Sequence, residues 1–366
     1  MTEPLRVLLD ASALPARPAG AGVYTLELAR ALDARADVDL RVGSPYDTGL
    51  GTWIETPAGA LRRNAWQQFK IGRVEADVVH GAHFAVPWRS SVPRVATVHD
   101  LTFYRLPRRY GWRHRSYYRA LSRLACRAER MIVPSRAVAG DVARYLGYPP
   151  ERVRVIPEAP RSLTPHPSTQ PQPVAHAPGA DAAAGNGSKA PYLLCVGTAE
   201  PGKRVVDAIR ALAAMPEEGR PMLVLAGNEG PLSEALRREA ARLGVAERVV
   251  FAGYVSDEAL GSLMAGAAAL VFASLYEGFG LPPLEAMALG TPVIATAAPA
   301  MTEVLGDAAA FVPVRDPAAI AREAARILGD ASWREELGAR GRERAAAYSW
   351  ERTAEETVAV YREVAA

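Results

Sequence analysis

Short apolar runs alternate with amphipathic stretches along the first 160 residues. Residues 5–10 are dominated by Leu and Val, which is typical of a buried strand, and residues 23–32 carry apolar side chains at helical spacing. The alternation continues with strands predicted at 76–80, 95–98, 131–133 and 153–156, and helices near 64–75, 111–128 and 136–147. This order indicates an α/β fold with a mostly parallel, doubly wound sheet.

A second alternation of the same kind fills the other half of the chain. Its strands are predicted at 192–197, 222–227, 249–253, 268–273 and 292–295. The last stretch has the spacing of an amphipathic helix, with one apolar face made of Trp350, Ala354, Val358, Tyr361 and Val364. We therefore expect two Rossmann-like domains and a terminal helix.

The two alternating regions are separated by a segment without periodicity. Residues 162–190 are rich in Pro, Ala and Gly and contain two isolated histidines, His166 and His176, to which we assign no role. A chain of 366 residues with 49% hydrophobic content can fill two cores. The predicted parts are a domain at 1–161, a disordered linker at 162–190, a domain at 191–348 and a final helix at 349–366.

Composition excludes several classes of protein. No apolar run approaches the roughly 20 residues of a membrane span, and the first residues lack a secretory leader pattern, so we expect a cytoplasmic protein. The two cysteines, Cys126 and Cys195, are far apart and fit a reducing compartment. Residues 37–39 read Asp-Val-Asp, a pattern that either binds Mg²⁺ or forms a solvated turn before the next strand.

Charge is distributed unevenly along the chain. Residues 1–160 hold 24 Lys and Arg against 15 Asp and Glu, a net +9, whereas the remainder has 19 against 25, a net −6. A basic domain suits nucleic acid, an anionic membrane or a phosphorylated substrate. Nucleic acid ranks last, because the sequence has neither zinc-finger spacing nor an RNA-binding aromatic motif.

Glycines follow the predicted strands directly, at Gly20, Gly197, Gly227, Gly253 and Gly278. Parallel sheets present ligand-binding residues at the carboxyl ends of their strands. We therefore expect these glycines to face one crevice.

Residues 276–285 combine a strand end, a glycine turn, a proline-initiated helix and two carboxylates. Gly278 and Gly280 leave backbone N–H groups accessible to an anion or to sugar hydroxyls, and Glu277 and Glu285 flank that turn. The alternative is an ordinary turn in which Glu285 only complements the helix dipole.

The spacing of these two carboxylates carries a family resemblance. The pattern E-x7-E with an internal GFGLP, followed by EAMA and by GTPV at 290–293, resembles the signature of family-four retaining glycosyltransferases. The resemblance implies the GT-B fold, in which two Rossmann-like domains face a central cleft and the final helix returns to the first domain. It further implies that Glu277 contacts the donor sugar and Glu285 binds ribose hydroxyls, for which a carboxylate is well suited.

Two segments of the first domain add to the resemblance. Gly20, Gly22 and Tyr24 match a G-x-G-x-Tyr loop that approaches the donor phosphates or the acceptor, and the alternative for the glycines is an ordinary tight turn. Residues 98–102 resemble a segment whose histidine, here His99, lies near the donor sugar. The alternative for His99 is a histidine satisfied by local backbone.

Residues 200–204 resemble the family's diphosphate-binding loop. Lys203 matches, but Thr198 and Gly202 stand at the two positions where the family has Arg, so the usual Arg and Lys pair is incomplete. Arg204 is our candidate for the missing charge. The alternative for Lys203 is a solvated loop lysine.

A fixed cation and backbone N–H groups would stabilise a departing diphosphate without metal or cofactor. The donor base is expected at Tyr254 and Val255. The predicted site residues are the catalytic His99, Lys203 and Glu277 and the donor-binding Gly20, Gly22, Thr198, Arg204, Tyr254, Val255, Gly278, Phe279, Gly280, Leu281 and Glu285.

The expected activity is the retaining transfer of a hexose from a nucleoside-diphosphate sugar to a glycan, lipid-linked or small-molecule acceptor. GDP-mannose is the first choice, because the HDLTF and GTAEP segments look most like mannosyltransferase relatives. The rivals are a glucan synthase or phosphorylase, and a donor-binding scaffold that has lost activity, for which the missing Arg is the argument.

Four arginines, Arg115, Arg119, Arg123 and Arg127, recur every four residues in a stretch where Glu129 is the only acidic residue from 105 to 130. Such spacing places them along one side of a helix. They form either a solvated face or a contact with anionic membrane at the inner face of the cell membrane.

Overall fold

The computed structural model describes residues 3–109, 111–164 and 191–366. Contacts divide the chain into two compact units, residues 1–159 with 348–366 and residues 160–347. Each unit is described by itself below. The predicted linker lies outside the described residues apart from 162–164, and so do His166 and His176.

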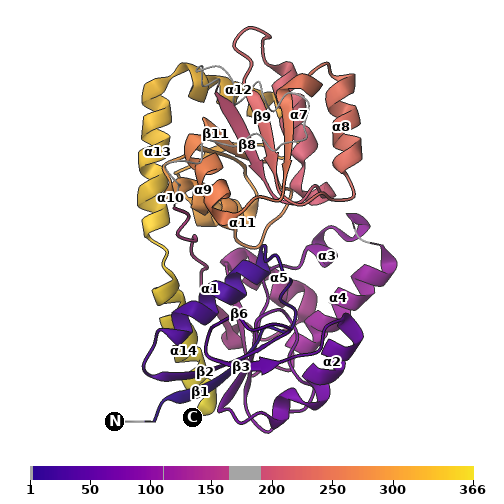
Figure 1. The fold of residues 1–366 in the computed structure, drawn as a ribbon, viewed down its shortest axis with the longest axis vertical. Helices are drawn as coiled ribbons and strands as arrows, with labels where there is room; N and C mark the ends of the chain where they lie inside the picture. The colour runs from indigo at the N-terminus through magenta and orange to yellow at the C-terminus, as the bar shows by residue number, and fades with distance from the viewer. Residues whose placement is uncertain (1–2, 110, 165–190) are drawn as a thin grey trace. The chain divides into compact units, whose positions relative to one another are not determined.

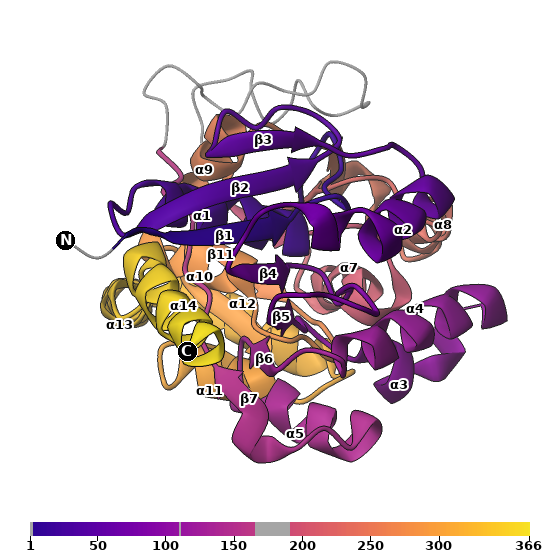
Figure 2. The ribbon, with the colours of Figure 1, turned by 90° about the horizontal axis from the view of Figure 1, so that it is seen from below.

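The first unit is a parallel sheet with helices packed against it. Its described strands follow the order β3-β2-β1-β4-β5-β6-β7, which Figure 2 shows from top to bottom. The sheet confirms the predicted α/β class, and β3 is a strand that the pattern did not reveal. The elements of this unit are β1 (Leu5–Asp10), α1 (Ala21–Asp33), β2 (Val38–Ser44), β3 (Thr52–Glu55), α2 (Ala60–Phe69), β4 (Val78–Gly81), β5 (Arg94–Thr97), α3 (Thr102–Arg105), α4 (Trp112–Ala125), β6 (Arg130–Val133), α5 (Arg136–Leu146), β7 (Val153–Val155) and α14 (Trp350–Ala365).

Helix boundaries in this unit follow local chemistry. Helix α5 begins after Ser135, whose side chain accepts a hydrogen bond from the Val138 N–H, and ends at Gly147 with φ 62°. The helix predicted at 64–75 is wrong in its extent, because it starts at Ala60 and ends at Phe69, and Ile71–Arg73 forms a 3-10 turn. The α-helix ends before this turn because Ile71 and Gly72 are weak helix formers. Ile71 is fully buried.

Helix α14 packs on α1 and on strands β4 to β6 within the first unit. A buried hydrogen-bond chain joins it to the sheet: Tyr361 Oη lies 2.6 Å from His80 Nδ1, and His80 Nε2 lies 2.8 Å from Thr97 Oγ1. Thr97 also lies 3.1 Å from the hydroxyl of Tyr24 on α1. Burial lowers the pKa of His80 to about 3, so this ring is neutral and has a structural role.

The second unit is also a parallel sheet, with described strands in the order β10-β9-β8-β11-β12-β13. Two Rossmann-like sheets were predicted, and both are present (Figure 1). The elements of this unit are β8 (Tyr192–Val196), α7 (Val205–Ala214), β9 (Met222–Ala226), α8 (Ser233–Arg242), β10 (Val249–Gly253), α9 (Asp257–Gly266), β11 (Ala269–Phe272), α10 (Leu281–Ala288), β12 (Val293–Thr296), α11 (Pro299–Leu305), β13 (Ala310–Val312), α12 (Pro317–Gly329) and α13 (Ala331–Ala346).

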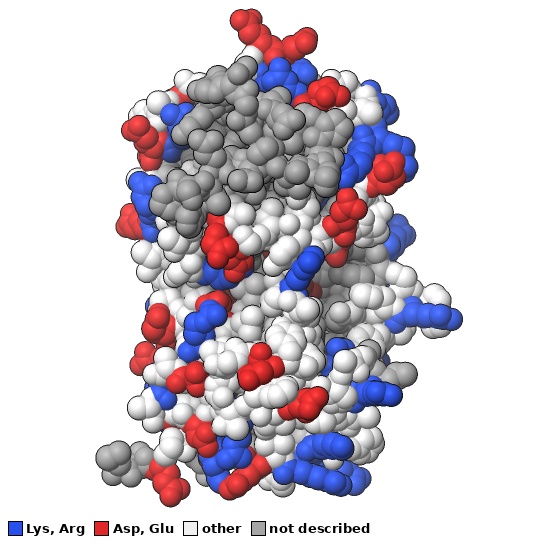
Figure 3. Space-filling view, in the orientation of Figure 1, with Lys and Arg blue, Asp and Glu red and all other residues white. Residues whose placement is uncertain are grey.

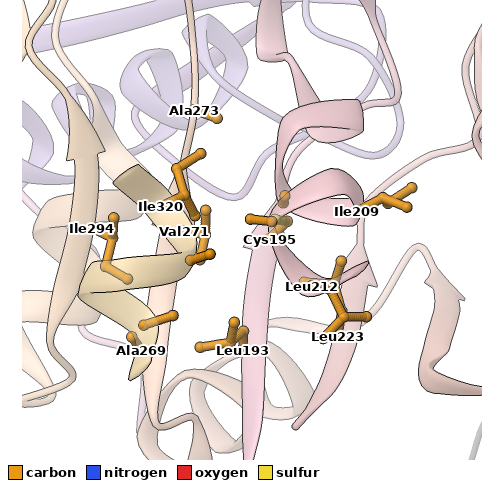
Figure 4. Packing of buried hydrophobic residues seen from close by; sticks show 14 of the residues in the cluster. Leu193, Cys195, Ile209, Leu212, Leu223, Ala269, Val271, Ala273, Ile294 and Ile320 are labelled. Atoms are coloured by element: carbon orange, nitrogen blue, oxygen red, sulfur yellow. The ribbon is translucent and has the colours of Figure 1, made fainter. Parts of the chain in front are cut away.

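The core of the second unit lies between the central strands and helices α7 and α12. Figure 4 shows Leu193 and Val271 from the strands with Ile209 and Leu212 of α7. Cys195 belongs to this cluster, and burial raises the pKa of its thiol to about 12. A thiol this buried stays protonated and acts as a small apolar side chain. In the part of the chain that the structure describes, no helix has the length and apolar character needed to cross a membrane.

We expect Tyr361→Phe to destabilise the first unit, because it leaves the buried His80 Nδ1 without its partner. An unsatisfied buried group costs about 1–3 kcal/mol, which thermal or urea denaturation resolves. Tyr145→Phe is the matched control, because that ring is half-buried and stacks on Tyr104. Equal stability of Tyr361→Phe and wild type would show that the buried chain contributes nothing.

Candidate donor-binding site

The order of strands in the second unit reverses at β8 and β11. Chain connections run from β8 outward through β9 to β10, and from β11 outward through β12 to β13. The loops that follow β8 and β11 are therefore the switch point, where open parallel sheets bind ligands. The Leu275 N–H donates to the Gly202 carbonyl at 2.8 Å and so ties the two loops together.

Lys203 and Glu277 meet at this switch point. Lys203 Nζ lies 2.7 Å from Glu277 Oε1, and the two side chains are 28% and 16% exposed. An ammonium group has three N–H bonds, so Lys203 can bind phosphate oxygens while it remains paired with Glu277. Only 3 of the 43 basic residues of the chain are lysines. The structure thus brings together two of the predicted catalytic residues.

The Arg204 side chain pairs with Asp207 and not with Glu277. Its backbone is left-handed, with φ 51°, and its guanidinium donates to both carboxylate oxygens of the buried Asp207 at 2.8 and 2.5 Å. Thr198 accepts a backbone hydrogen bond from Glu200 and packs against Gly230. The positive charge beside Glu277 therefore comes from Lys203, whereas Asp207 already balances Arg204.

The turn that follows Glu277 requires glycine. Gly280 has φ +109°, and a Cβ at this position would lie 2.6 Å from Met301 Cε. Helix α10 starts at Leu281 with two prolines in its first turn, as predicted. Prolines have no N–H, so backbone donors toward an anion would come from Gly278, Phe279, Gly280 and Leu281 rather than from the next helical residues.

Glu285 is buried, with 1% of its side chain exposed, and is paired with Arg161, a residue that the sequence pattern did not single out. Arg161 donates from Nε to Oε1 at 2.6 Å and from Nη2 to Oε2 at 3.2 Å. Nη1 of Arg161 also donates to Asp257 Oδ1 at 2.6 Å. Arg161 ended the first predicted domain, whereas its contacts place it in the second unit. The two partners are 124 residues apart, so no local spacing pointed to the pair.

Three glycines at neighbouring strand ends line a pocket of the second unit. Gly197 and Gly227 follow β8 and β9, Gly253 is the last residue of β10, and Phe251 and Glu229 are among the other lining residues. A Cβ at Gly227 would lie 2.3 Å from the Gly197 carbonyl oxygen, so the backbones approach too closely for any side chain. Close packing therefore requires glycine at position 227.

The expected contacts of the donor base lie next to this pocket. Tyr254 and Val255 directly follow Gly253, and the side chain of Tyr254 is exposed. Four of the five expected glycines are thus in the second unit, whereas Gly20 is in the first.

Gly20 and Gly22 lie at the start of α1, after β1. Gly20 has φ 53° and precedes the helix, and nothing lies within 4 Å of a Cβ built there. Gly22 is buried, and its Cβ would lie 3.2 Å from Pro18. Tyr24, two residues on, is part of the buried hydrogen-bond chain to Thr97.

His99 uses both ring nitrogens within the first unit. Nε2 donates to the Ala82 carbonyl at 2.9 Å, and Nδ1 lies 3.1 Å from Oε1 of the buried Glu158. Burial lowers the pKa of His99, but the hydrogen bond and the charge of Glu158 outweigh it, so the net pKa is raised. The raised pKa favours the protonated form of His99, which would form a buried ion pair with Glu158. His83, by contrast, is neutral, because burial lowers its pKa to about 3.

The four arginines that recur every four residues, Arg115, Arg119, Arg123 and Arg127, do not share one environment. Arg115 and Arg119 are half-buried, and the Arg119 guanidinium lies over the Tyr104 ring at 4.8 Å. Arg123 and Arg127 are exposed, and Arg127 lies over the Trp88 ring at 3.9 Å. Figure 3 shows Lys and Arg on the side of the first unit where Figure 1 places α2 and α4.

The two carboxylates of the Asp-Val-Asp pattern pair with different arginines. Asp37 accepts hydrogen bonds from Arg35 and Arg362, and Asp39 pairs with Arg41 at 3.5 Å. Across residues 3–109, 111–164 and 191–366, no three His, Cys, Asp or Glu side chains gather as a metal site would require.

Comparison with known proteins identifies the class to which this fold and site belong. The model for Glycosyltransferase Family 4 matches residues 18–159, and the model for Glycosyl transferases group 1 matches residues 180–344. The chain belongs to this family of glycosyltransferases, as the E-x7-E resemblance implied.

Individual relatives agree with this assignment. The chain is 31% identical to the O-antigen chain mannosyltransferase B of Escherichia coli, over 82% of this chain and 77% of that protein. It is 41% identical to the MMP alpha-(1->4)-mannosyltransferase of Mycolicibacterium hassiacum, over 33% of this chain and 30% of that protein. The structure of sucrose-phosphate synthase from Thermosynechococcus elongatus superimposes with a TM-score of 0.79 at 24% identity, covering 98% of each chain. The fold is GT-B, as predicted.

We expect the raised pKa of His99 to make stability depend on pH. A raised folded-state pKa stabilises fully below the ordinary value of about 6.5, and this contribution is lost as pH rises through the raised pKa. The melting temperature of wild type relative to His99→Gln should therefore fall as pH is increased from about 5 to 9.

Glu158→Gln should lose the same pH dependence, because it removes the charge that holds the proton on His99. His80 and His83 titrate near pH 3 and do not contribute in this range. A difference between wild type and both variants that is constant across this range would contradict the ion pair.

Proposed function

We propose that this protein is a retaining hexosyltransferase that uses a nucleoside-diphosphate sugar, with GDP-mannose as the first candidate donor. The observation that carries the proposal is the Lys203 and Glu277 pair at the switch point of the second unit. In this proposal Lys203 binds the diphosphate, Glu277 positions the sugar, Glu285 binds the ribose, and Tyr254 and Val255 lie against the base.

The reaction breaks the bond between the sugar C1 and the terminal phosphate oxygen and forms a bond from C1 to an acceptor hydroxyl oxygen. The acceptor proton passes to the departing phosphate oxygen, on the same face of the sugar, so the configuration at C1 is retained. Negative charge grows on the diphosphate as it leaves. Lys203 and the backbone N–H groups of residues 278–281 stabilise that charge in place of Mg²⁺.

The choice of mannose is supported by the names of relatives. Two of them are mannosyltransferases, at 31% and 41% identity over the matched residues. The acceptor in this proposal is a hydroxyl of a glycan, a lipid-linked saccharide or a small molecule. His99 and Gly22 belong to the first unit, and we propose that they contribute there to sugar and acceptor binding.

Two rival functions lead to different results in one assay. The protein is incubated with GDP-mannose, UDP-glucose and other nucleotide sugars, with and without oligosaccharide acceptors and with and without EDTA, and nucleoside diphosphate release is measured. We expect acceptor-stimulated release of GDP from GDP-mannose that EDTA does not reduce. Nucleotide binding without any turnover would favour a donor-binding scaffold, and elongation of a glucan primer would favour a glucan synthase.

We expect Lys203→Ala to lower turnover by at least about a hundredfold at saturating donor, as loss of one preorganised charge stabiliser does. The melting temperature should stay near that of wild type, because the Lys203 side chain is partly exposed. Lys70→Ala is the control, because Lys70 is an exposed lysine of the first unit. Turnover of Lys203→Ala close to wild type would rule out its role at the leaving group.

We further propose that the first unit binds anionic membrane at the inner face of the cell membrane. Its exposed surface includes the aromatic residues Phe69, Trp88 and Trp112, which are 73%, 51% and 68% exposed. Exposed aromatic side chains near arginines suit the membrane interface. Arg123 on α4 and Arg127, two residues beyond its end, are both exposed. Each arginine near an anionic surface contributes about 1 kcal/mol.

We expect the double variant Arg123→Gln and Arg127→Gln to sediment less with anionic vesicles at low salt, with no change toward neutral vesicles. The control is Arg238→Gln with Arg340→Gln, which removes the same charge from exposed arginines of the second unit. Equal loss in both double variants would mean that net charge alone, and not this surface, determines binding.

A further inference from the structure

Arg161 joins two helices of the second unit, at the start of α9 and in the middle of α10. It donates two hydrogen bonds to Glu285 on α10 and one to Asp257 on α9, at 2.6, 3.2 and 2.6 Å. The segment that carries Arg161 is itself fixed, because Leu163 is buried and packs against Gly261 of α9. The guanidinium is therefore held in place from its own chain and by two carboxylates.

The ion pair with Arg161 offsets the free-energy cost of burying the Glu285 carboxylate. With 1% of its side chain exposed, Glu285 would be costly to ionise without a cation. Arg161 is half-buried as well, with 15% of its side chain exposed, and its pKa remains raised because the two carboxylates outweigh the burial that opposes its charge. Only the ionised carboxylate accepts hydrogen bonds on both oxygens without donating any.

The geometry also leaves capacity for a ligand. Two carboxylate oxygens offer about four lone-pair positions, and Arg161 occupies one on each oxygen. One position on each oxygen remains, which matches the two neighbouring hydroxyls of a ribose. A neutral or freely rotating Glu285 would lose this match.

We propose that Arg161 is a positioning residue that makes the donor site select ribonucleotides. Its two hydrogen bonds fix the plane of the Glu285 carboxylate, so that both ribose hydroxyls are bound at once. The inference rests on the proposed function, because it takes a nucleoside diphosphate as the ligand. Arg161 itself touches neither the sugar nor the diphosphate in this proposal.

The test compares ribonucleotides with their 2′-deoxy forms. Affinities for GDP, UDP, 2′-deoxy-GDP and 2′-deoxy-UDP are measured by calorimetry for wild type, Arg161→Gln, Arg161→Lys and Asp257→Asn. Of GDP and UDP, the one that wild type binds with higher affinity should bind at least about tenfold more tightly than its own 2′-deoxy form, as expected for a hydrogen bond to a charged group. Arg161→Gln should bind both forms with nearly equal affinity, whereas Asp257→Asn should keep the wild-type ratio.

Further arms separate the possible failures. Arg161→Lys should restore part of the ratio, because it keeps the charge but loses the two-point geometry. Glu285→Gln should also abolish the ratio, and its combination with Arg161→Gln should add nothing. If wild type binds no nucleoside diphosphate, the proposed function is wrong. If wild type binds and discriminates, and folded Arg161→Gln or Arg161→Lys discriminates as well as wild type, the role of Arg161 is wrong.

Discussion

The candidate site of the second unit depends on the ion pair between Lys203 and Glu277. Each residue follows a central strand of a parallel sheet, and the sheet places the two strand ends side by side. A lysine in this position is held by one carboxylate and still has N–H groups for a second anion. The glycine turn that follows Glu277 and the glycines after β8, β9 and β10 keep other side chains away from the same edge of the sheet.

Buried carboxylates in both units are matched by a basic partner, which is far away in the sequence for Glu285 and Glu158 and three residues away for Asp207. Glu285 has Arg161, Asp207 has Arg204, and Glu158 has His99. Each of these carboxylates is nearly inaccessible to water, so each requires a cation or a hydrogen-bond donor to remain ionised. In the second unit Arg204 neutralises the charge of Asp207, whereas Lys203 still has N–H groups that can bind the ligand.

Much of the fold and part of the site could be predicted from the sequence. The strands of both sheets are mostly short apolar runs, and the glycines near their ends could be selected from that pattern, whereas Lys203 and Glu277 were selected through the resemblance to family motifs. Strand β3 was missed because its residues Thr52–Glu55 are mostly exposed and form no apolar run. Arg161 was missed because its partner is 124 residues away, and the buried environment of His99 depends on Glu158, 59 residues away. Local periodicity does not encode such pairings.

The most direct test of the central claim is a crystal structure of the protein with GDP-mannose or its product GDP. We expect the diphosphate to lie against Lys203 Nζ and the backbone of residues 278–281, with both ribose hydroxyls on the carboxylate of Glu285. A nucleotide bound in the second unit with its phosphates away from Lys203 and its ribose away from Glu285 would show that these residues do not form the donor site.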